Sequence, residues 1–315
     1  MDVVTFGESM VLFNPDSNGP IRYVQNFNKS IAGAESNVAI ALARLGHEVG
    51  WFSRLGNDEF GRYIKAVIRG EGVEVSRAIT DEEKSTGILF KERFIHSNPN
   101  VYYYRKDSAA SNLKPEDIDI EYIKKAKILH ITGITPALSK SCRDTVLKAI
   151  DIARENGVKV SFDPNIRLKL WDIDEATSVL LEIAQKADII FPGIDEGEIL
   201  LKMRHPKDIA DKFLSLGCSI VAVKLGKDGC YAASSKEAHY IPGYLVERPE
   251  DTVGAGDGFA AGFLSGYIKN CELFQCAEYA NAIGAMATMV KGDMEGYPIY
   301  DQLMQFMGKN KVIDR

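Results

Sequence analysis

The stretch "DTVGAGDGFAAGFLSGYI" (residues 251–268) places three glycines and an alanine around one acid, Asp257, and then continues as a long apolar segment. This pattern predicts a glycine-rich loop followed by a helix. The backbone N–H groups of Gly254, Ala255 and Gly256 would converge in front of that helix, where the helix dipole adds partial positive charge and favours an anion. A carboxylate beside an anion site is costly unless it has a task, such as taking a proton from a hydroxyl that attacks a phosphoryl group. The alternative is a helix capped by Asp after a simple glycine turn.

Strand-like and helical segments alternate along most of the 315 residues. Strand, helix, strand, helix is typical of a largely parallel sheet that helices cover on both faces. No linker or clean boundary interrupts the pattern, so we expect one α/β domain over residues 1–315. The last third is predicted to be helical, at 255–269, 273–290 and 299–307.

Two segments, at about residues 10–30 and 86–105, do not fit this alternation and are richer in aromatic residues. We expect short antiparallel strands at "MVLFNPD", "PIRYVQ", "TGILFKERF" and "VYYYRKD". Together they would form one small sheet over the edge of the main sheet, where ligands bind in open α/β folds, and would act as a lid. An apolar outer face of this lid predicts a homodimer through it, or a higher oligomer.

Alternation in "VYYYRKD" (101–107) places Tyr103 and Arg105 on one face of the strand and Tyr102 and Tyr104 on the other. One pair would face the ligand, and the other a packed layer or a partner subunit. The alternative is an edge strand whose aromatic side chains have no binding role.

Two other turns carry candidate ligand contacts. In "SIAGAESNVAIALARLG" (30–46), Gly33 lets a ligand approach the backbone, and Asn37 offers donors and acceptors to hydroxyl groups. In "SFDPNIR" (161–167), a strand ends before Pro164, and Arg167 is a candidate anion binder at the sheet edge. A plain helix start and a surface turn explain the same residues without function.

Two weaker motifs point to phosphate and metal. "KLGKDG" (224–229) contains a lysine and two glycines that can approach a nucleotide phosphate, although a strand-to-hairpin turn explains it equally well. "IIFPGIDEGEIL" (189–200) places acids after a strand, where Glu196 can hold Mg²⁺ through water. Acids at a helix N-terminus, favoured by the dipole, are the alternative.

Composition excludes several classes of protein. A formal net charge of −6 argues against a general nucleic-acid binder, and no apolar run is long enough to span a bilayer. The N-terminus has no basic region or cleavage site, so we expect a cytoplasmic protein. The five cysteines form no CxxC pair, which predicts free thiols rather than disulfides or a zinc site.

In this order, "AGAESNVAIALARLG", "GNDEFG", "DPNIR", "KLGKDG" and "DTVGAGDG" resemble the motifs of the ribokinase-like (PfkB) carbohydrate kinases over almost the whole chain. The resemblance implies a Rossmann-type α/β sandwich with a small β lid, ATP as the phosphoryl donor and Mg²⁺ as a helper. It implies that Asp257 is the general base and that the amides of residues 254–256 form an anion hole. The implied ATP contacts are Lys224, Gly226, Gly229, Gly254, Gly256 and, near the adenine, Asn281.

The resemblance also implies a monovalent cation such as K⁺, held by Asp251 and the Val253 carbonyl. The chain departs from the family at one position: many members carry Asn-x-x-Glu after the strand that "IIFPG" resembles, whereas here Gly193 replaces the Asn and Glu196 keeps the acid. The role of that Asn in positioning magnesium therefore does not carry over to Gly193.

Within the family, "YYYRKDSAAS" and "DPNIRLKLW" are most similar to kinases of 2-dehydro-3-deoxygluconate, which phosphorylate an acid sugar at its terminal 6-hydroxyl. Arg105 and Arg167 would then bind the sugar carboxylate, beside Gly33, Asn37 and Tyr103. Fructokinases are the nearest alternative. A nicotinamide dehydrogenase would need GxGxxG after the first strand, which "FGESMV" lacks, and a non-catalytic sugar-binding regulator would be expected to lack the base.

Overall fold

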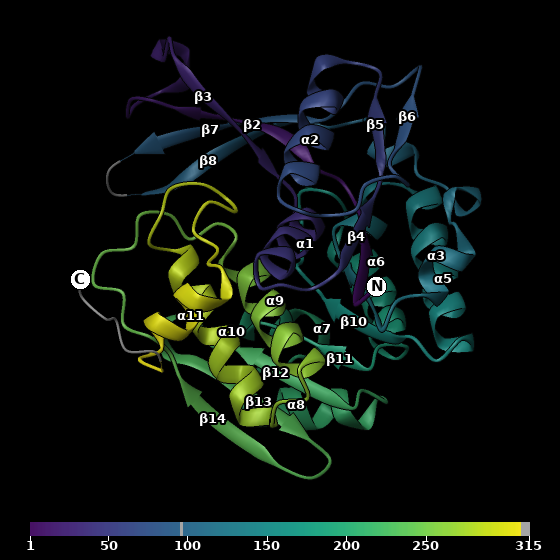
Figure 1. Cartoon of the computed structure of the whole chain (residues 1–315), viewed down its shortest axis with the longest axis vertical. Helices are drawn as coiled ribbons and strands as arrows, with labels where there is room; N and C mark the ends of the chain where they lie inside the picture. Colours follow the sequence, from purple (N-terminus) through teal and green to yellow (C-terminus); the bar gives the residue numbers. More distant parts are fainter. Residues whose placement is uncertain (95–96, 310–315) are drawn as a thin grey trace.

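The computed structural model describes residues 1–94 and 97–309. Its centre is an eight-stranded sheet with the order β14-β13-β12-β11-β10-β9-β1-β4 (Figure 1). The strands from β12 to β4 pair in parallel, and β13 and β14 extend the sheet as an antiparallel hairpin. The predicted α/β class is therefore confirmed. The strands are β1 (Val3–Phe6), β4 (Val49–Phe52), β9 (Ile128–Thr132), β10 (Lys159–Asp163), β11 (Ile189–Ile190), β12 (Ile220–Lys224), β13 (Gly229–Ser234) and β14 (Ala238–Pro242).

Helices cover both faces of this sheet, and each face has its own apolar core. Neighbouring residues of one strand point to opposite cores: Val3 belongs to one and Val4 to the other, as the pleat of a strand requires. On the Val3 side lie α1 (Ala34–Arg44), α2 (Glu59–Gly70), α9 (Ala255–Ile268), α10 (Leu273–Ala287) and α11 (Tyr300–Phe306). On the Val4 side lie α3 (Ile120–Lys124), α4 (Thr135–Leu138), α5 (Lys140–Glu155), α6 (Ile173–Ala184), α7 (Ile194–Leu201) and α8 (Pro206–Ser215).

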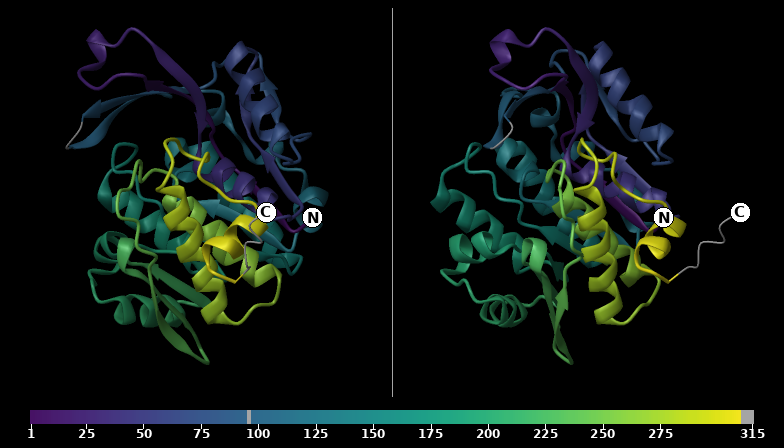
Figure 2. Two further views of the ribbon diagram at one scale, coloured as in Figure 1. Left: turned by 60° about the vertical axis from the view of Figure 1, so that its left-hand side comes forward. Right: turned by 90° about the vertical axis from the view of Figure 1, so that its left-hand side faces the viewer.

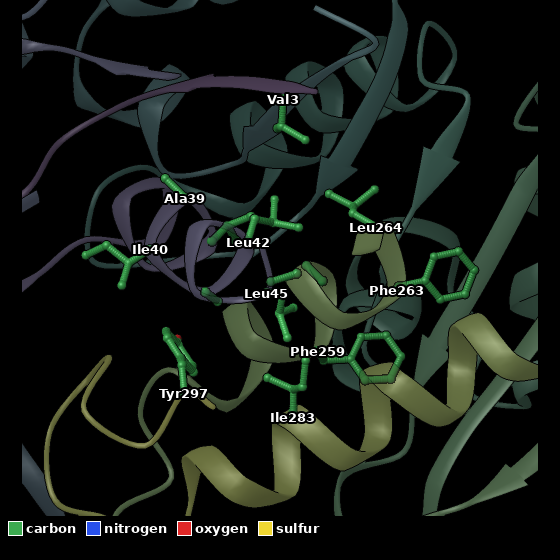
Figure 3. Close-up of a cluster of buried hydrophobic side chains, with 14 of the residues drawn as sticks. Val3, Ala39, Ile40, Leu42, Leu45, Phe259, Phe263, Leu264, Ile283 and Tyr297 are labelled. Atoms are coloured by element: carbon green, nitrogen blue, oxygen red, sulfur yellow. The ribbon is translucent and has the colours of Figure 1, made fainter. Parts of the chain in front are cut away.

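Helix α9 is wedged between α1 and α10. Leu42 of α1, Phe259 of α9 and Ile283 of α10 lie in one buried cluster (Figure 3). Glycines allow the close approach: a Cβ added to Gly262 would lie 2.6 Å from the backbone oxygen of Tyr279 on α10. The small residues that follow Asp257 thus fix the position of α9, and with it the position of its N-terminus.

A separate four-stranded sheet, in the order β3-β2-β7-β8, projects from one end of the molecule (Figures 1 and 2). Its strands come from the two segments that break the α/β alternation: β2 (Met10–Pro15), β3 (Phe27–Ala32), β7 (Ile88–Phe94) and β8 (Ser97–Tyr104). Residues 95 and 96 of the predicted 86–105 segment lie outside the described residues. The outward-pointing Tyr102 and Tyr104 of β8 are 42% and 65% exposed, and the dimer predicted from this face stays a prediction.

Two details of this sheet differ from the expectation. The segment "PIRYVQ" is not a strand: a 3₁₀ turn at Ile21–Tyr23 replaces it, because the Ile21 N–H donates to Glu92 Oε1 (2.9 Å) instead of joining a ladder. The sheet is also not wholly antiparallel, since β2 pairs in parallel with β7. The segment "EVGWFSRLG" (48–56) contains two strands, β4 and the short strand β5 (Arg54–Gly56), and β5 pairs with β6 (Ile79–Asp81) in a separate sheet.

All five cysteines are free thiols, as expected: four are buried and Cys271 is half-buried. Within the described ranges, none of the helices combines the length and the apolar character needed to cross a bilayer.

The packing of α9 on α10 predicts opposite effects for one chemical change at two glycines. Gly262→Ala should lower the free energy of unfolding by about 1–3 kcal/mol, because the added methyl group overpacks the helix contact. Gly70→Ala is the matched control, since Gly70 is exposed near the end of α2 with no atom within 4 Å of an added Cβ. Alanine there should raise stability by about 0.5–1 kcal/mol. Urea unfolding of both variants measures the difference, and equal effects would contradict the packing argument.

Candidate active site

A cavity of about 410 Å³ lies where the main sheet, α1, α9 and the small sheet meet. The carboxyl ends of β10 and β12 and the N-termini of α1 and α9 open into it, which is the usual place for ligands in open α/β sheets. Most of the predicted site residues line it together: Gly33, Asn37, Tyr103, Arg105, Arg167, Glu196, Lys224, Gly254, Gly256 and Asp257.

Asp257 lies in the first turn of α9, directly after the glycine-rich loop. The loop turns at Gly254, whose φ of 79° is left-handed, and a Cβ there would lie 2.0 Å from the Asp293 carbonyl oxygen. Only glycine suits this position. The first N–H groups of a helix have no partner in a preceding turn, so the start of α9 presents donors to the cavity. These local features place the predicted anion hole next to the carboxylate.

The carboxyl group of Asp257 is buried and held by one amide: Asn37 Nδ2 on α1 donates to Asp257 Oδ2 over 2.8 Å. Burial raises the pKa of Asp257 to about 7, although the Asn37 hydrogen bond opposes the shift. The neighbouring charge of Asp163 adds to the rise, and that of Arg167 lowers it. A carboxyl group that titrates near neutrality is well suited to general base catalysis.

Lys224 ends β12 and points at the end of β10. Its Nζ lies 2.8 and 2.9 Å from the two carboxylate oxygens of Asp163. Burial would lower the pKa of Lys224, but the carboxylates of Asp163 and Glu196 outweigh that effect and raise it, so the amine stays charged. A fixed cation thus lies close to the 254–256 loop, 3.8 Å from where a Cβ on Gly256 would be.

Lys224 and Glu196 also line a second, more open cavity of about 580 Å³, together with the predicted phosphate residue Gly226. The two cavities adjoin at these shared side chains. The geometry therefore suits two ligands that meet beside Lys224, one in each cavity.

Glu196 does not present a bare carboxylate. Its Oε1 accepts the Ile166 N–H (3.0 Å) and its Oε2 accepts the Gly193 N–H (2.7 Å), which caps α7. Each oxygen keeps a lone pair for water. In the part of the chain that the structure describes, no three His, Cys, Asp or Glu side chains converge on a metal position. The residues fit Mg²⁺ only if the ion keeps several coordinating waters and contacts Glu196 through them, as Mg²⁺ usually does in proteins.

The two candidate arginines differ in their surroundings. Arg105 is mostly buried, and its Nη2 lies 2.5 Å from Oε2 of the fully buried Glu8, while its Nε has no hydrogen-bond partner. Arg167 is exposed at the cavity and forms no ion pair with any residue of the described ranges. Glu8 thus neutralises the charge of Arg105, and Arg167 is the freer cation of the two.

Four predicted residues line neither cavity: Asn281, Gly229, Asp251 and Ala255. Asn281 donates its amide to the carbonyls of Ile241 and Pro242 (both 3.1 Å) and so ties α10 to β14. Gly229 has a φ of 101° at the turn into β13. Asp251 pairs with Lys91 beside a neighbouring hollow. The ligand roles of all four stay predictions, and that of Ala255 would be through its backbone N–H.

Sequence reasoning missed Glu8, Lys91 and Asp293. Glu8 follows the end of β1, where a parallel strand delivers ligand groups, so its position was a usable signal. Lys91 shares one strand face with the buried Leu89 in "ILFKERF", and alternation therefore predicts an inward lysine. Asp293 lies in the loop after α10, and nothing local marks it.

Comparison with known proteins agrees with this geometry. Residues 1–299 match the model of the pfkB family carbohydrate kinases. The chain is 43% identical to a 2-dehydro-3-deoxygluconokinase of Bacillus subtilis, over 99% of this chain and 97% of that protein.

Two solved structures are similar over 98% of this chain. One is a 2-dehydro-3-deoxygluconokinase of Thermotoga maritima (TM-score 0.91, 27% identity, 99% of that chain). The other is an aminoimidazole riboside kinase of Salmonella enterica in complex with aminoimidazole riboside and an ATP analogue (TM-score 0.83, 28% identity, 100% of that chain). The fold, the arrangement around Asp257 and these relatives lead to one conclusion: the chain belongs to the pfkB family of carbohydrate kinases.

Proposed function

We propose that this kinase transfers the γ-phosphoryl group of ATP to the 6-hydroxyl of 2-dehydro-3-deoxygluconate. The observation that carries the proposal is the buried Asp257 carboxyl, with a pKa of about 7, at the start of α9 and next to two adjoining cavities. The Bacillus subtilis relative supports the choice of an acid sugar.

The proposed reaction uses Asp257 as the general base. The sugar lies in the 410 Å³ cavity with its terminal hydroxyl near the Asp257 carboxylate, which accepts the proton as the hydroxyl oxygen bonds to the γ-phosphorus. The bond from the γ-phosphorus to the bridging oxygen breaks, and ADP leaves through the second cavity. The N–H groups of the 254–256 loop and the Lys224 ammonium stabilise the charge on the transferred group.

The remaining groups bind and exclude water. Asn37 orients the Asp257 carboxylate through its 2.8 Å hydrogen bond. Glu196 would hold Mg²⁺ through water, and the ion would offset the phosphate charge. The small sheet brings Tyr103 and Arg105 to the sugar cavity, which supports its role as a lid over a single kinase domain.

One observation favours a second candidate function, fructokinase. Glu8 cancels the charge of Arg105, so the sugar cavity holds less free positive charge than two arginines alone would provide. A neutral hexose would need only hydroxyl partners such as Asn37.

The proposed base predicts a selective loss of turnover. Asp257→Asn should lower kcat by at least ~10²-fold, the low end for a positioned general base, and leave the affinities for ATP and sugar nearly unchanged. Asp211→Asn, an equivalent change at an exposed position on α8, is the matched control. Steady-state kinetics with calorimetric binding measurements test this prediction, and near-wild-type turnover in Asp257→Asn would remove Asp257 from the mechanism.

The same variant should gain stability in a pH-dependent way. Because the native pKa of Asp257 is raised to about 7 from 3.8, the native protein binds this proton more tightly than the unfolded chain does. The stability gained from this bound proton is complete below the unfolded pKa and is lost as the pH rises through about 7. Above pH 7 the wild-type protein therefore bears the full free-energy cost of a buried, ionised Asp257, whereas asparagine at this position bears none. Melting temperatures should favour Asp257→Asn more at pH 8 than at pH 5; an equal difference at both would refute a raised pKa.

The choice of substrate is tested by the arginines. If Arg167 binds the sugar carboxylate, Arg167→Ala should reduce kcat/KM for 2-dehydro-3-deoxygluconate by about 10- to 100-fold more than for fructose, because a charge-assisted hydrogen bond contributes roughly 1.5–3 kcal/mol. Arg105→Lys tests the second arginine, because lysine keeps a cation beside Glu8. Arg154→Ala, in the last turn of α5, is the control. Equal losses for both sugars would assign the arginines to phosphate, and a wild type that prefers fructose would establish the fructokinase.

A further inference from the structure

A buried ammonium group joins the small sheet to the anion-hole loop. Lys91 of β7 is only 4% exposed, and its Nζ lies 3.0 Å from Asp293 Oδ1 and 3.3 Å from Asp251 Oδ2. These distances make ion pairs with both carboxylates, so the Lys91 ammonium lies as a cation between Asp251 and Asp293.

Both carboxylates belong to the frame of the anion hole. Asp251 Oδ1 accepts the Val253 N–H (3.2 Å) at the start of the loop. The Asp293 backbone oxygen packs against Gly254, and the Tyr297 hydroxyl donates to the Gly254 carbonyl (2.8 Å) from the same segment. A group that bridges Asp251 and Asp293 therefore fixes the loop at Val253 and at Gly254.

The charge balance requires a cation here. The Asp293 carboxylate is buried and the Asp251 carboxylate is half-buried; the two repel each other, and both adjoin the loop that we propose accepts a phosphoryl anion. The residues do not fit the free monovalent ion that the family resemblance implied, because one oxygen of Asp251 already accepts the Val253 N–H and the other already faces Lys91. The positive charge is supplied by the chain.

We propose that the Lys91 ammonium is a built-in substitute for a monovalent cation, which makes the kinase independent of K⁺ and couples the small sheet to the anion-hole loop. Lys91 is a positioning residue, since it acts through Asp251 and Asp293 and does not line the sugar cavity. The effect of Lys91 on turnover rests on the proposed role of the 254–256 loop. The binding of K⁺ after Lys91 is removed does not depend on that role.

The test replaces Lys91 by methionine, which keeps an unbranched chain and removes the charge. Lys91 and Asp251 both line a hollow of about 680 Å³, so an ion from solvent can reach the vacated position. The comparison uses KCl, NaCl and tetramethylammonium chloride at one ionic strength, because tetramethylammonium is too large for the position. Lys29→Met is the matched control, since Lys29 belongs to the same sheet and its ammonium lies over the Tyr63 ring instead.

Wild type and Lys29→Met should show the same kcat/KM in all three salts. Lys91→Met should lose about 10- to 100-fold in tetramethylammonium, the scale of one charge-assisted contact, and KCl should restore most of that loss. The melting temperature of Lys91→Met should rise with KCl and not with tetramethylammonium, whereas that of wild type should respond equally to both. This second readout needs neither sugar nor ATP, so it separates failure of the cation proposal from failure of the proposed function.

Strong activation of wild type by K⁺ would overturn the proposal. So would full activity of Lys91→Met without K⁺, or a loss that neither KCl nor NaCl restores. If Lys91→Met does not fold, the double variant Lys91→Met/Asp293→Asn removes one carboxylate together with the ammonium. This double variant should fold, and its melting temperature should depend on K⁺. A melting temperature that does not change with K⁺ would also overturn the proposal.

Discussion

The burial of one carboxyl group at the start of α9 is the constraint on which the rest of this structure depends. Burial raises the pKa of Asp257 to about 7, so keeping this carboxyl group away from water costs stability at higher pH. Asn37 relieves only part of it, through a single hydrogen bond from α1. Glycines let α9 pack closely against α10, and this packing fixes the helix that carries the carboxyl group.

The sheet supplies the second element of the site. Parallel strands bring their carboxyl ends to one edge, so Asp163 of β10 and Lys224 of β12 form an ion pair although 61 residues separate them in the chain. That pair stands between the two cavities and keeps a cation at their junction. The chemistry therefore needs the whole sheet to form before any of its groups can act together.

The small sheet contributes charge as well as cover. It delivers Arg105 to Glu8 and Lys91 to Asp251 and Asp293, so each of its inward cations meets a buried carboxylate. A buried carboxylate without its cation is strongly destabilising, which gives the small sheet a defined docked position. In our proposal this docking and the formation of the anion hole are one event, because Lys91 takes part in both.

The sequence by itself determined the α/β alternation, the glycine-rich start of α9, Asp257 as the candidate base, and Gly33 and Asn37 as candidate ligand contacts. These features can be read locally, since glycine requirements, helix dipoles and apolar periodicity act over a few residues. Only the tertiary structure decided that Glu8 neutralises Arg105, that Lys91 meets Asp293, and that β2 pairs in parallel with β7. Alternation along a strand says which face a side chain takes, but its partner across the fold depends on distances between segments far apart in the chain, and no local pattern records those distances.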